Sequence, residues 1–175
     1  MEDSAGEPGA GEWRRRFITE EVDDARPVAG ELFLRRFGHE IPGYPRHFVL
    51  YYMAQGNAAQ RRVAAYVHQL PHREIYLTGG MCADERLYRS LPRWLFAQVK
   101  QEGGLATLVT RDSMAMLGDS PAAFGHVGEP RARQADLRTG FVDTGKPLLM
   151  AFWRRSLPRA EQERLIAIAE ACCPF

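Results

Sequence analysis

The stretch Gln101-Glu102-Gly103-Gly104-Leu105-Ala106 (QEGGLA) lies between two segments with helical spacing, and the rest of the chain can be read outward from it. A glycine-rich turn that opens onto a helix presents several unpaired backbone N–H groups at one point, and the helix dipole adds to their attraction for anions. Glycine also lets the backbone approach a phosphate or pyrophosphate closely. Two such glycines are more often a helix C-cap followed by a loop, so the flanking sequence has to decide.

Length and composition indicate one ordinary folded domain. The chain has 175 residues, of which 45% are hydrophobic and 26% charged, values typical of a soluble globular protein. We expect a disordered polar tail at residues 1–12 and a single domain at 13–175. The net charge of +1 gives no general attraction to nucleic acid or to membranes, so neither is an expected partner.

The three cysteines do not suggest a disulfide framework, because their number is odd and two of them are adjacent. No Cys or His pair has metal-ligand spacing: His68 and His72 are separated by Pro71, which breaks the helix that would align them. No metal is therefore expected. The N-terminal residues lack an apolar signal core and no apolar run could span a bilayer, so a reducing cytoplasm is the simplest location.

Before the stretch, apolar patterns predict a strand, a helix at about 25–37 and a three-strand meander. Gly79-Gly80, inside the last of these strands, is typical of a bulge or of a close backbone contact. A turn at Pro71-His72-Arg73 is expected between the last two strands. The expected strands are 13–19, His47–Ala54, Arg61–Gln69 and Glu74–Cys82.

Around and after the stretch, helices and strands alternate. Residues 83–100 read as two helical segments, with Asp84 as a cap and Pro92 in the first turn of the second. Residues 107–117 fit a helix, although 105–110 alone would pass for a strand. The apolar tail 172–175 should pack on the sheet or against a second copy, which would make a homodimer. The remaining predictions are a strand at 122–128, a helix at 129–139, a strand at 146–154 and a terminal helix from Ser156.

This order of elements resembles that of the GNAT acyltransferase family. In that family the turn has the form Gln/Arg-x-x-Gly-x-Gly/Ala and holds the pyrophosphate of acetyl-CoA, and QEGGLA matches its three defining positions. A later family pattern is also partly kept, through Ala132, Arg138 and Gly140-Phe141. The resemblance implies an α/β (α+β) fold, a GNAT-like acyl-CoA N-acyltransferase fold with a mixed, mostly antiparallel central sheet flanked by helices.

Two departures from the family pattern stand out, and the first leaves a rival register open. Residues 83–100 lie between the meander and the turn, which are nearly adjacent in the family. A rival register would place the turn at Arg86–Leu91, directly after the strand, but this segment contains no glycine. The tyrosine that usually protonates the leaving thiolate is absent, and Asp136 stands at its aligned position.

The resemblance implies that acetyl-CoA or another acyl-CoA is the co-substrate and that an amine attacks its thioester directly. A backbone N–H of Gly80, Met81 or Cys82 would polarise the thioester carbonyl, although Gly79-Gly80 can equally be a plain bulge. The pyrophosphate would lie on the turn, at Gln101, Gly103, Gly104, Leu105 and Ala106.

The amine must lose a proton, and three side chains are candidates for the general base: Asp84, Glu74 and His126. Each can also be an ordinary surface or satisfied polar residue. An acylated Cys82 is disfavoured, because no histidine has a readable pairing with it and isolated cysteines are usually small core residues.

We therefore expect an acyltransferase that moves an acetyl or short acyl group from acyl-CoA to an amine of an unidentified small molecule or protein. A second hypothesis is a degenerate GNAT-like domain that binds CoA or a protein partner without catalysis, which the missing tyrosine and the insertion favour. A third, the related acyl-homoserine-lactone synthases, lacks support from an Arg/Phe/Trp signature near the N-terminus.

Overall fold

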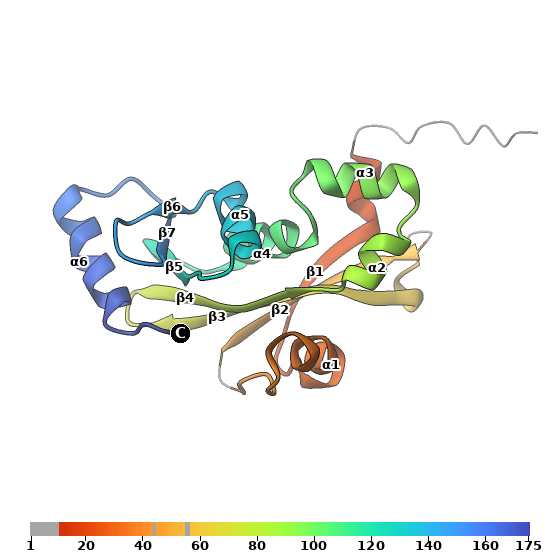
Figure 1. Ribbon diagram of the computed structural model, residues 1–175, viewed down its shortest axis with the longest axis horizontal. Coiled ribbons are helices and arrows are strands. Elements are labelled where there is room, and N and C mark those ends of the chain that lie inside the picture. Colours follow the sequence, from red (N-terminus) through yellow and green to blue (C-terminus); the bar gives the residue numbers. More distant parts are fainter. Residues whose placement is uncertain (1–10, 44, 55–56) are drawn as a thin grey trace, which may run out of the picture.

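A computed structural model describes residues 11–43, 45–54 and 57–175 of the chain. The expected tail at 1–12 therefore falls almost wholly outside the described residues, as do Tyr44 and the turn residues 55–56. The fold is a seven-stranded sheet in the order β1-β2-β3-β4-β5-β7-β6, flanked by helices (Figure 1). The strands are β1 (Phe17–Val22), β2 (Arg46–Met53), β3 (Arg61–His72), β4 (Ile75–Ala83), β5 (Ala122–His126), β6 (Val142–Asp143) and β7 (Leu149–Trp153).

The pairing of the strands confirms a mixed, mostly antiparallel sheet. Strands β1 to β4 form an antiparallel series, and β7 pairs antiparallel with both β5 and β6. The parallel pair is β4 with β5, and it extends over Tyr76–Thr78 of β4 before the two strands separate. Because β4 continues to Ala83, its last part has a backbone edge with no neighbouring strand on the β5 side.

Helices cover both faces of the sheet. Helix α1 lies on one face, and α3, α4 and α5 lie on the other (Figure 1). The largest apolar cluster joins α3 and α4 to the strands through Leu95, Val99, Leu108, Phe48 and Leu50. The helices are α1 (Arg26–Phe37), α2 (Glu85–Ser90), α3 (Arg93–Gln101), α4 (Leu105–Met116), α5 (Pro130–Thr139) and α6 (Arg159–Glu170), with short 3-10 helices η1 (Glu12–Arg16) and η3 (Ala58–Gln60).

The C-terminal tail packs on its own chain, the first of the two expected arrangements. Leu165 and Ala169 of α6 are fully buried against β4, β5 and β7, and Cys172, Cys173 and Phe175 pack on the same cluster. These three tail residues are partly buried, and Pro174 is exposed. None of the helices in the described part of the chain is long and apolar enough to cross a membrane.

Several predicted boundaries were wrong. The first strand is β1, not 13–19, because residues 12–16 form η1. Pro71 and His72 belong to β3, and the turn lies at 73–74. Pro71 is tolerated there because it lies beyond Gln69, the last residue of β3 that pairs with β2, so its missing N–H interrupts no ladder on that side. The alternative strand at 105–110 is wrong as well, since these residues form the start of α4.

Candidate functional site

The glycines of the QEGGLA stretch end one helix and begin the next. Gly103 and Gly104 both have left-handed or otherwise positive backbone angles, with φ of 101° and 93°. Their N–H groups donate to the carbonyls of Lys100 and Val99, at 3.1 and 2.8 Å, and so close the last turn of α3. The interpretation as a helix C-cap is therefore correct for these two N–H groups.

The start of α4 is nevertheless open. Gly104 is its N-cap and contributes no side-chain cap. The first intrahelical bond is donated by Leu108 to the carbonyl of Gly104, at 3.2 Å. In the described part of the chain, the N–H groups of Leu105, Ala106 and Thr107 have no hydrogen-bond partner. The stretch thus combines a C-cap with an unpaired helix N-terminus, the feature that suits an anion.

The segment of the rival register has a helix start that is capped, unlike the start of α4. Residues 86–91 lie almost wholly in α2, and its N-cap Asp84 accepts hydrogen bonds from the N–H groups of Arg86 and Leu87 at 2.9 and 3.0 Å. A carboxylate of the chain itself therefore already satisfies the first turn of α2. Asp84, a candidate general base, is thereby the cap of this helix.

A hollow that we call the turn pocket lies over the start of α4. Three cationic side chains border it, Lys100, Arg131 and Arg138, and none of its described lining residues is acidic. A Cβ on Gly103 would stand 2.8 Å from Cδ of Arg138 and 2.8 Å from Oγ1 of Thr107, so glycine is required there by close packing. The lining residues are Tyr88, Lys100, Gly103, Gly104, Pro130, Arg131, Gln134, Ala135 and Arg138.

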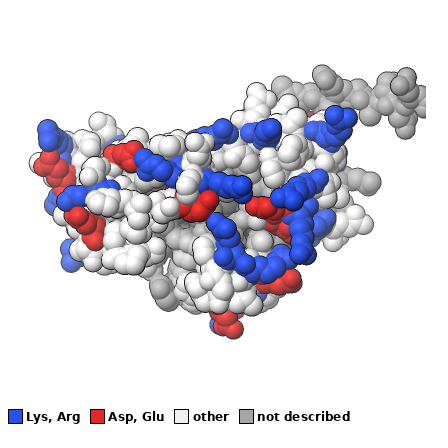
Figure 2. Space-filling model, in the orientation of Figure 1, with Lys and Arg blue, Asp and Glu red and all other residues white. Residues whose placement is uncertain are grey.

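Two further pockets continue from the turn pocket. The middle pocket shares Arg131 with it and contains Ala106 of α4. The splay pocket, where β4 and β5 separate, shares Arg36, Met81 and other residues with the middle pocket. Figure 2 shows Lys and Arg side chains curving around a hollow in this face, with acidic side chains among them. We call the three pockets together the groove.

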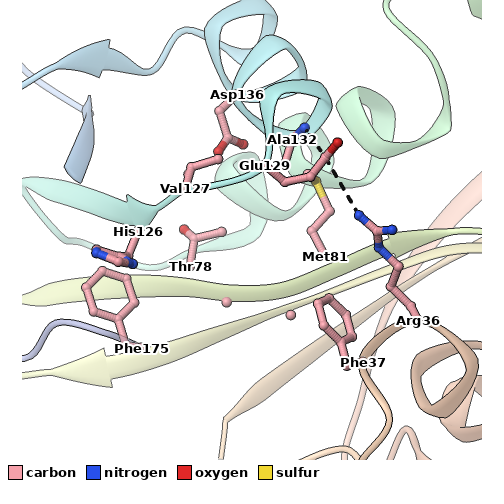
Figure 3. A pocket seen from close by; sticks show the side chains of 13 residues that line it. Arg36, Phe37, Thr78, Met81, His126, Val127, Glu129, Ala132, Asp136 and Phe175 are labelled. Atoms are coloured by element: carbon pink, nitrogen blue, oxygen red, sulfur yellow. Dashed lines mark hydrogen bonds and ion pairs between the residues drawn. The ribbon is translucent and has the colours of Figure 1, made fainter. Parts of the chain in front are cut away.

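The splay pocket is lined by residues of α1 on one face of the sheet, of α5 on the other face, and of strands β4 and β5. Its volume is about 260 Å³. An ion pair of 3.7 Å between Arg36 of α1 and Glu129, the N-cap of α5, spans it (Figure 3). The lining residues are Arg36, Phe37, Thr78, Gly79, Gly80, Met81, His126, Val127, Gly128, Glu129, Ala132, Asp136 and Phe175.

Strand β4 has a β-bulge at Gly80 and Met81, directly after Gly79, and a histidine of the neighbouring strand packs against the two glycines. Two residues of β4, Gly80 and Met81, lie opposite a single residue of β3. A Cβ on Gly79 or Gly80 would lie 2.6 or 2.4 Å from the ring of His68, and Gly80 has φ of +51°. The expected bulge is thus present, and its glycines are required because the imidazole occupies the space of their side chains.

His68 ends a chain of buried polar groups. Its Nδ1 lies 3.2 Å from the hydroxyl of Tyr66, which lies 2.8 Å from Nδ1 of His47. Burial lowers the pKa of His68 to about 4, so the ring is neutral at neutral pH. The imidazole that packs against the bulge is therefore uncharged.

The other candidate residues are scattered. His126 lines the splay pocket, with its ring centroid 6.1 Å from that of Phe175. Glu74 precedes the opposite end of β4, pairs with Arg164, and does not line the described groove. Cys82 is buried, and burial raises the pKa of its thiol to about 12, which opposes a nucleophilic role.

Some of the predicted CoA-binding residues line the groove and others do not. Gly103 and Gly104 line the turn pocket, and Ala106 lines the middle pocket. Leu105 is a buried core residue that can offer its N–H and not its side chain, while Gln101 is the exposed last residue of α3 and lines none of the described pockets. Gly80 and Met81 line the splay pocket.

Asp136 is a groove residue to which the sequence assigned no role. It is only 4% exposed, lines the splay pocket, and its burial raises the pKa of the carboxyl to about 7. The one signal in the sequence was its position in a family pattern that has tyrosine there. Among the described residues, no group of three His, Cys, Asp or Glu side chains could hold a metal ion.

No family model and no curated protein matches the chain. Several solved structures overlap with it weakly. The KacTA–DNA complex is 17% identical over 86% of this chain and 98% of that chain, with a TM-score of 0.42. AtaTR bound with AcCoA is 15% identical over 86% and 98%, with a TM-score of 0.41. AtaT complexed with acetyl-methionyl-tRNAfMet is 14% identical over 86% and 99%, with a TM-score of 0.40.

These overlaps are too weak to bear on the site. The topology of the chain itself supports the resemblance: a strand and helix, an antiparallel meander, a glycine turn that opens α4, and a fifth strand parallel to β4 that separates from it. The arrangement agrees with the mixed, mostly antiparallel sheet flanked by helices that the resemblance implies.

Proposed function

We propose that the chain binds an acyl-CoA along the groove and transfers its acyl group to an amine. The observation that carries the proposal is the pairing of an open helix N-terminus with Lys100, Arg131 and Arg138 at one end of the groove. Backbone N–H groups and cations together suit the phosphates of CoA. The other end of the groove is the unpaired edge of β4, where backbone donors can reach an acyl group.

In this proposal each end of the groove has a separate task. The N–H groups of Leu105, Ala106 and Thr107 hold the pyrophosphate. A backbone N–H of the β4 bulge, at Gly80, Met81 or Cys82, polarises the thioester carbonyl as negative charge develops on its oxygen.

The proton of the amine needs an acceptor. His126 is the candidate base that lines the splay pocket, whereas Asp84 caps α2 and Glu74 lies outside the groove. An unprotonated amine attacks the carbonyl carbon, and the thiolate of CoA leaves. A small molecule or a protein can supply the amine.

One observation favours the alternative, that the domain binds CoA without transferring the acyl group. Two of the three candidate bases have structural partners: Asp84 caps a helix and Glu74 pairs with Arg164. In that case the groove would serve as a CoA sensor or as part of a complex with another protein.

Two measurements test the proposal. The first is a thermal-unfolding titration of the whole chain with CoA and acetyl-CoA. A ligand at 100 times its Kd adds about 2.7 kcal/mol to stability, which corresponds to a rise in Tm on the order of 5–10 °C. No shift at millimolar ligand would remove both CoA hypotheses.

The second measurement follows release of free CoA thiol from acetyl-CoA, with a panel of amine acceptors: small primary amines, lysine peptides, peptide N-termini and aminoacyl-tRNA. Thiol release that depends on an acceptor supports transfer. Stabilisation by CoA without release on any acceptor favours the non-catalytic alternative.

A further inference from the structure

Asp136 is a buried carboxyl group without a partner. Its side chain lies on the face of α5 that also carries Glu129 and Ala132, and this face lines the splay pocket (Figure 3). Oδ2 lies 3.5 Å from where a Cβ on Gly125 would stand. No described residue donates a hydrogen bond to the carboxyl or forms an ion pair with it, although Asp136 is only 4% exposed.

Stability gives no reason for an aspartate at this position. Aspartate is a poor residue for a helix interior, and a buried charge without a partner destabilises a fold. A burial of this kind favours the neutral carboxylic acid, and no nearby charge is a cause of the raised pKa. The carboxyl therefore stays protonated to about neutral pH.

The charged groups around the splay pocket leave the carboxyl in this state. His126 lines the pocket from β5, Arg36 lines it from α1, and Glu129 lines it from the start of α5. Glu129 accepts a hydrogen bond from the N–H of Ala132 at 2.8 Å and pairs with Arg36, so these two charges largely compensate each other. Asp136 thus presents an O–H donor to the pocket.

Helix α5 connects this donor to the opposite end of the groove. Its residues 131, 134, 135 and 138 line the turn pocket, while 132 and 136 line the splay pocket. A CoA whose phosphates lie in the turn pocket would extend along α5, so its sulfur end would approach the face that carries Asp136. A leaving thiolate at that end needs a donor, which a neutral carboxyl can supply.

We propose that Asp136 protonates the sulfur of CoA as the acyl group leaves. The inference rests on the proposed transfer function. The amine nitrogen forms a bond to the carbonyl carbon, the C–S bond breaks, and the electron pair of that bond on sulfur takes the proton of the Asp136 carboxyl. The nitrogen gives up its extra proton to the base or to water, and the Asp136 carboxylate takes up a proton again from solvent after the product leaves.

The kinetic test compares the whole chain with Asp136→Asn, which keeps the shape and removes the transferable proton. The variant should bind CoA within twofold of the parent and transfer the acyl group about 100-fold more slowly. For the parent, kcat should fall as pH rises through about 7, as the carboxyl ionises. This descending limb should be absent in Asp136→Asn. Asp136→Glu should restore part of the rate and the limb.

Leu137→Ala is the matched control, because Leu137 is the next residue of α5, is 45% exposed and does not line the described groove. It should keep the parental rate and pH profile. A parental rate in Asp136→Asn would overturn the proposal. Loss of an ascending limb, in place of the descending one, would overturn the donor role because it would make Asp136 a base.

A carboxyl titration by ¹³C NMR supplies a test that needs no acceptor. One aspartate signal should titrate near pH 7 in the parent and be missing from Asp136→Asn. A normal titration near pH 4 would overturn the donor role even if transfer is observed. Normal CoA binding and a signal near pH 7, without transfer to any acceptor, would instead reject the transfer function and the donor role with it.

Discussion

Helices α2 and α4 begin in opposite ways: α2 follows directly after β4, and α4 follows after α2 and α3. The first turn of α2 is capped by the carboxylate of Asp84, whereas α4 begins at Gly104 with no side-chain cap. The two helices lie in the two registers that the sequence left open. A helix N-terminus can bind an anion only where the chain has not supplied one itself, so a glycine in place of Asp, Ser or Thr is the informative residue.

The largest expected effect comes from giving α4 the cap that α2 has. Gly104→Asp should weaken CoA binding by about 100-fold or more, because a carboxylate would compete with phosphate oxygens for the same N–H groups and repel them. The strained backbone, with φ of 93° at this residue, adds to the effect. Isothermal titration with CoA measures it, and circular dichroism checks the fold.

Gly104→Ala separates charge from strain. A Cβ at this position meets no atom within 4 Å, so alanine introduces the backbone strain alone. We expect a loss of CoA affinity well below that of Gly104→Asp. Normal CoA binding by a folded Gly104→Asp protein would mean that the start of α4 is not the phosphate site.

A smaller effect is expected at the cations of the turn pocket. Lys100→Ala and Arg138→Ala should each weaken CoA binding by about tenfold or somewhat more, because a hydrogen bond to a charged group contributes about 1.5–3 kcal/mol and these exposed cations should lie at the low end of that range. The loss should shrink at high salt, which screens exposed charges.

Arg89→Ala is the control for these two variants. Arg89 lies on α2, pairs with Glu85 at 3.0 Å and does not line the turn pocket, so CoA affinity should be unchanged. A strong loss at Arg89 with none at Arg138 would favour the rival register.

The smallest effect on binding is expected from opening α2. Asp84→Ala should lower the free energy of unfolding by about 1 kcal/mol, because the N–H groups of Arg86 and Leu87 lose their cap. CoA affinity should stay within twofold of the parent. Chemical denaturation and CoA titration on the same protein check both values, and a large loss of affinity would show that the two helix starts do not differ as described.

The predicted elements that held were those with a strong local pattern. The apolar strands at 47–54 and 61–69 and the helix at 25–37 are set by alternation and helical spacing, which are visible within one segment. The parallel pairing of β4 with β5 agrees with the mixed sheet that the family resemblance implied. Strand β6, with two residues, was too short to leave such a pattern.

The parts of the site that the sequence did not reveal depend on distant contacts. The pair Gly79-Gly80 indicated a bulge in the sequence, but only the fold shows that His68 occupies the space where their side chains would lie. The raised pKa of Asp136 arises from burial between α5 and β5, which no local pattern records. Asp84, in contrast, was recognisable as a cap because an N-cap acts within its own turn.

The segment between β4 and α4, residues 84–104, satisfies the free backbone hydrogen-bonding groups at both of its ends with its own residues. Asp84 satisfies its first N–H groups, and Gly103 and Gly104 satisfy its last carbonyls. An apolar stripe of buried residues, Leu87, Leu91, Leu95 and Val99, packs it into the core. Ion pairs of Glu85 with Arg131 and of Glu102 with Arg111 join it to α5 and α4 at the surface. During evolution the length and the exposed face of this segment could therefore change, provided that the buried stripe, the Asp84 cap and the two glycines are kept. Tyr88, which lines the turn pocket, belongs to this segment, so the residues of one wall of the groove can change while the sheet stays the same.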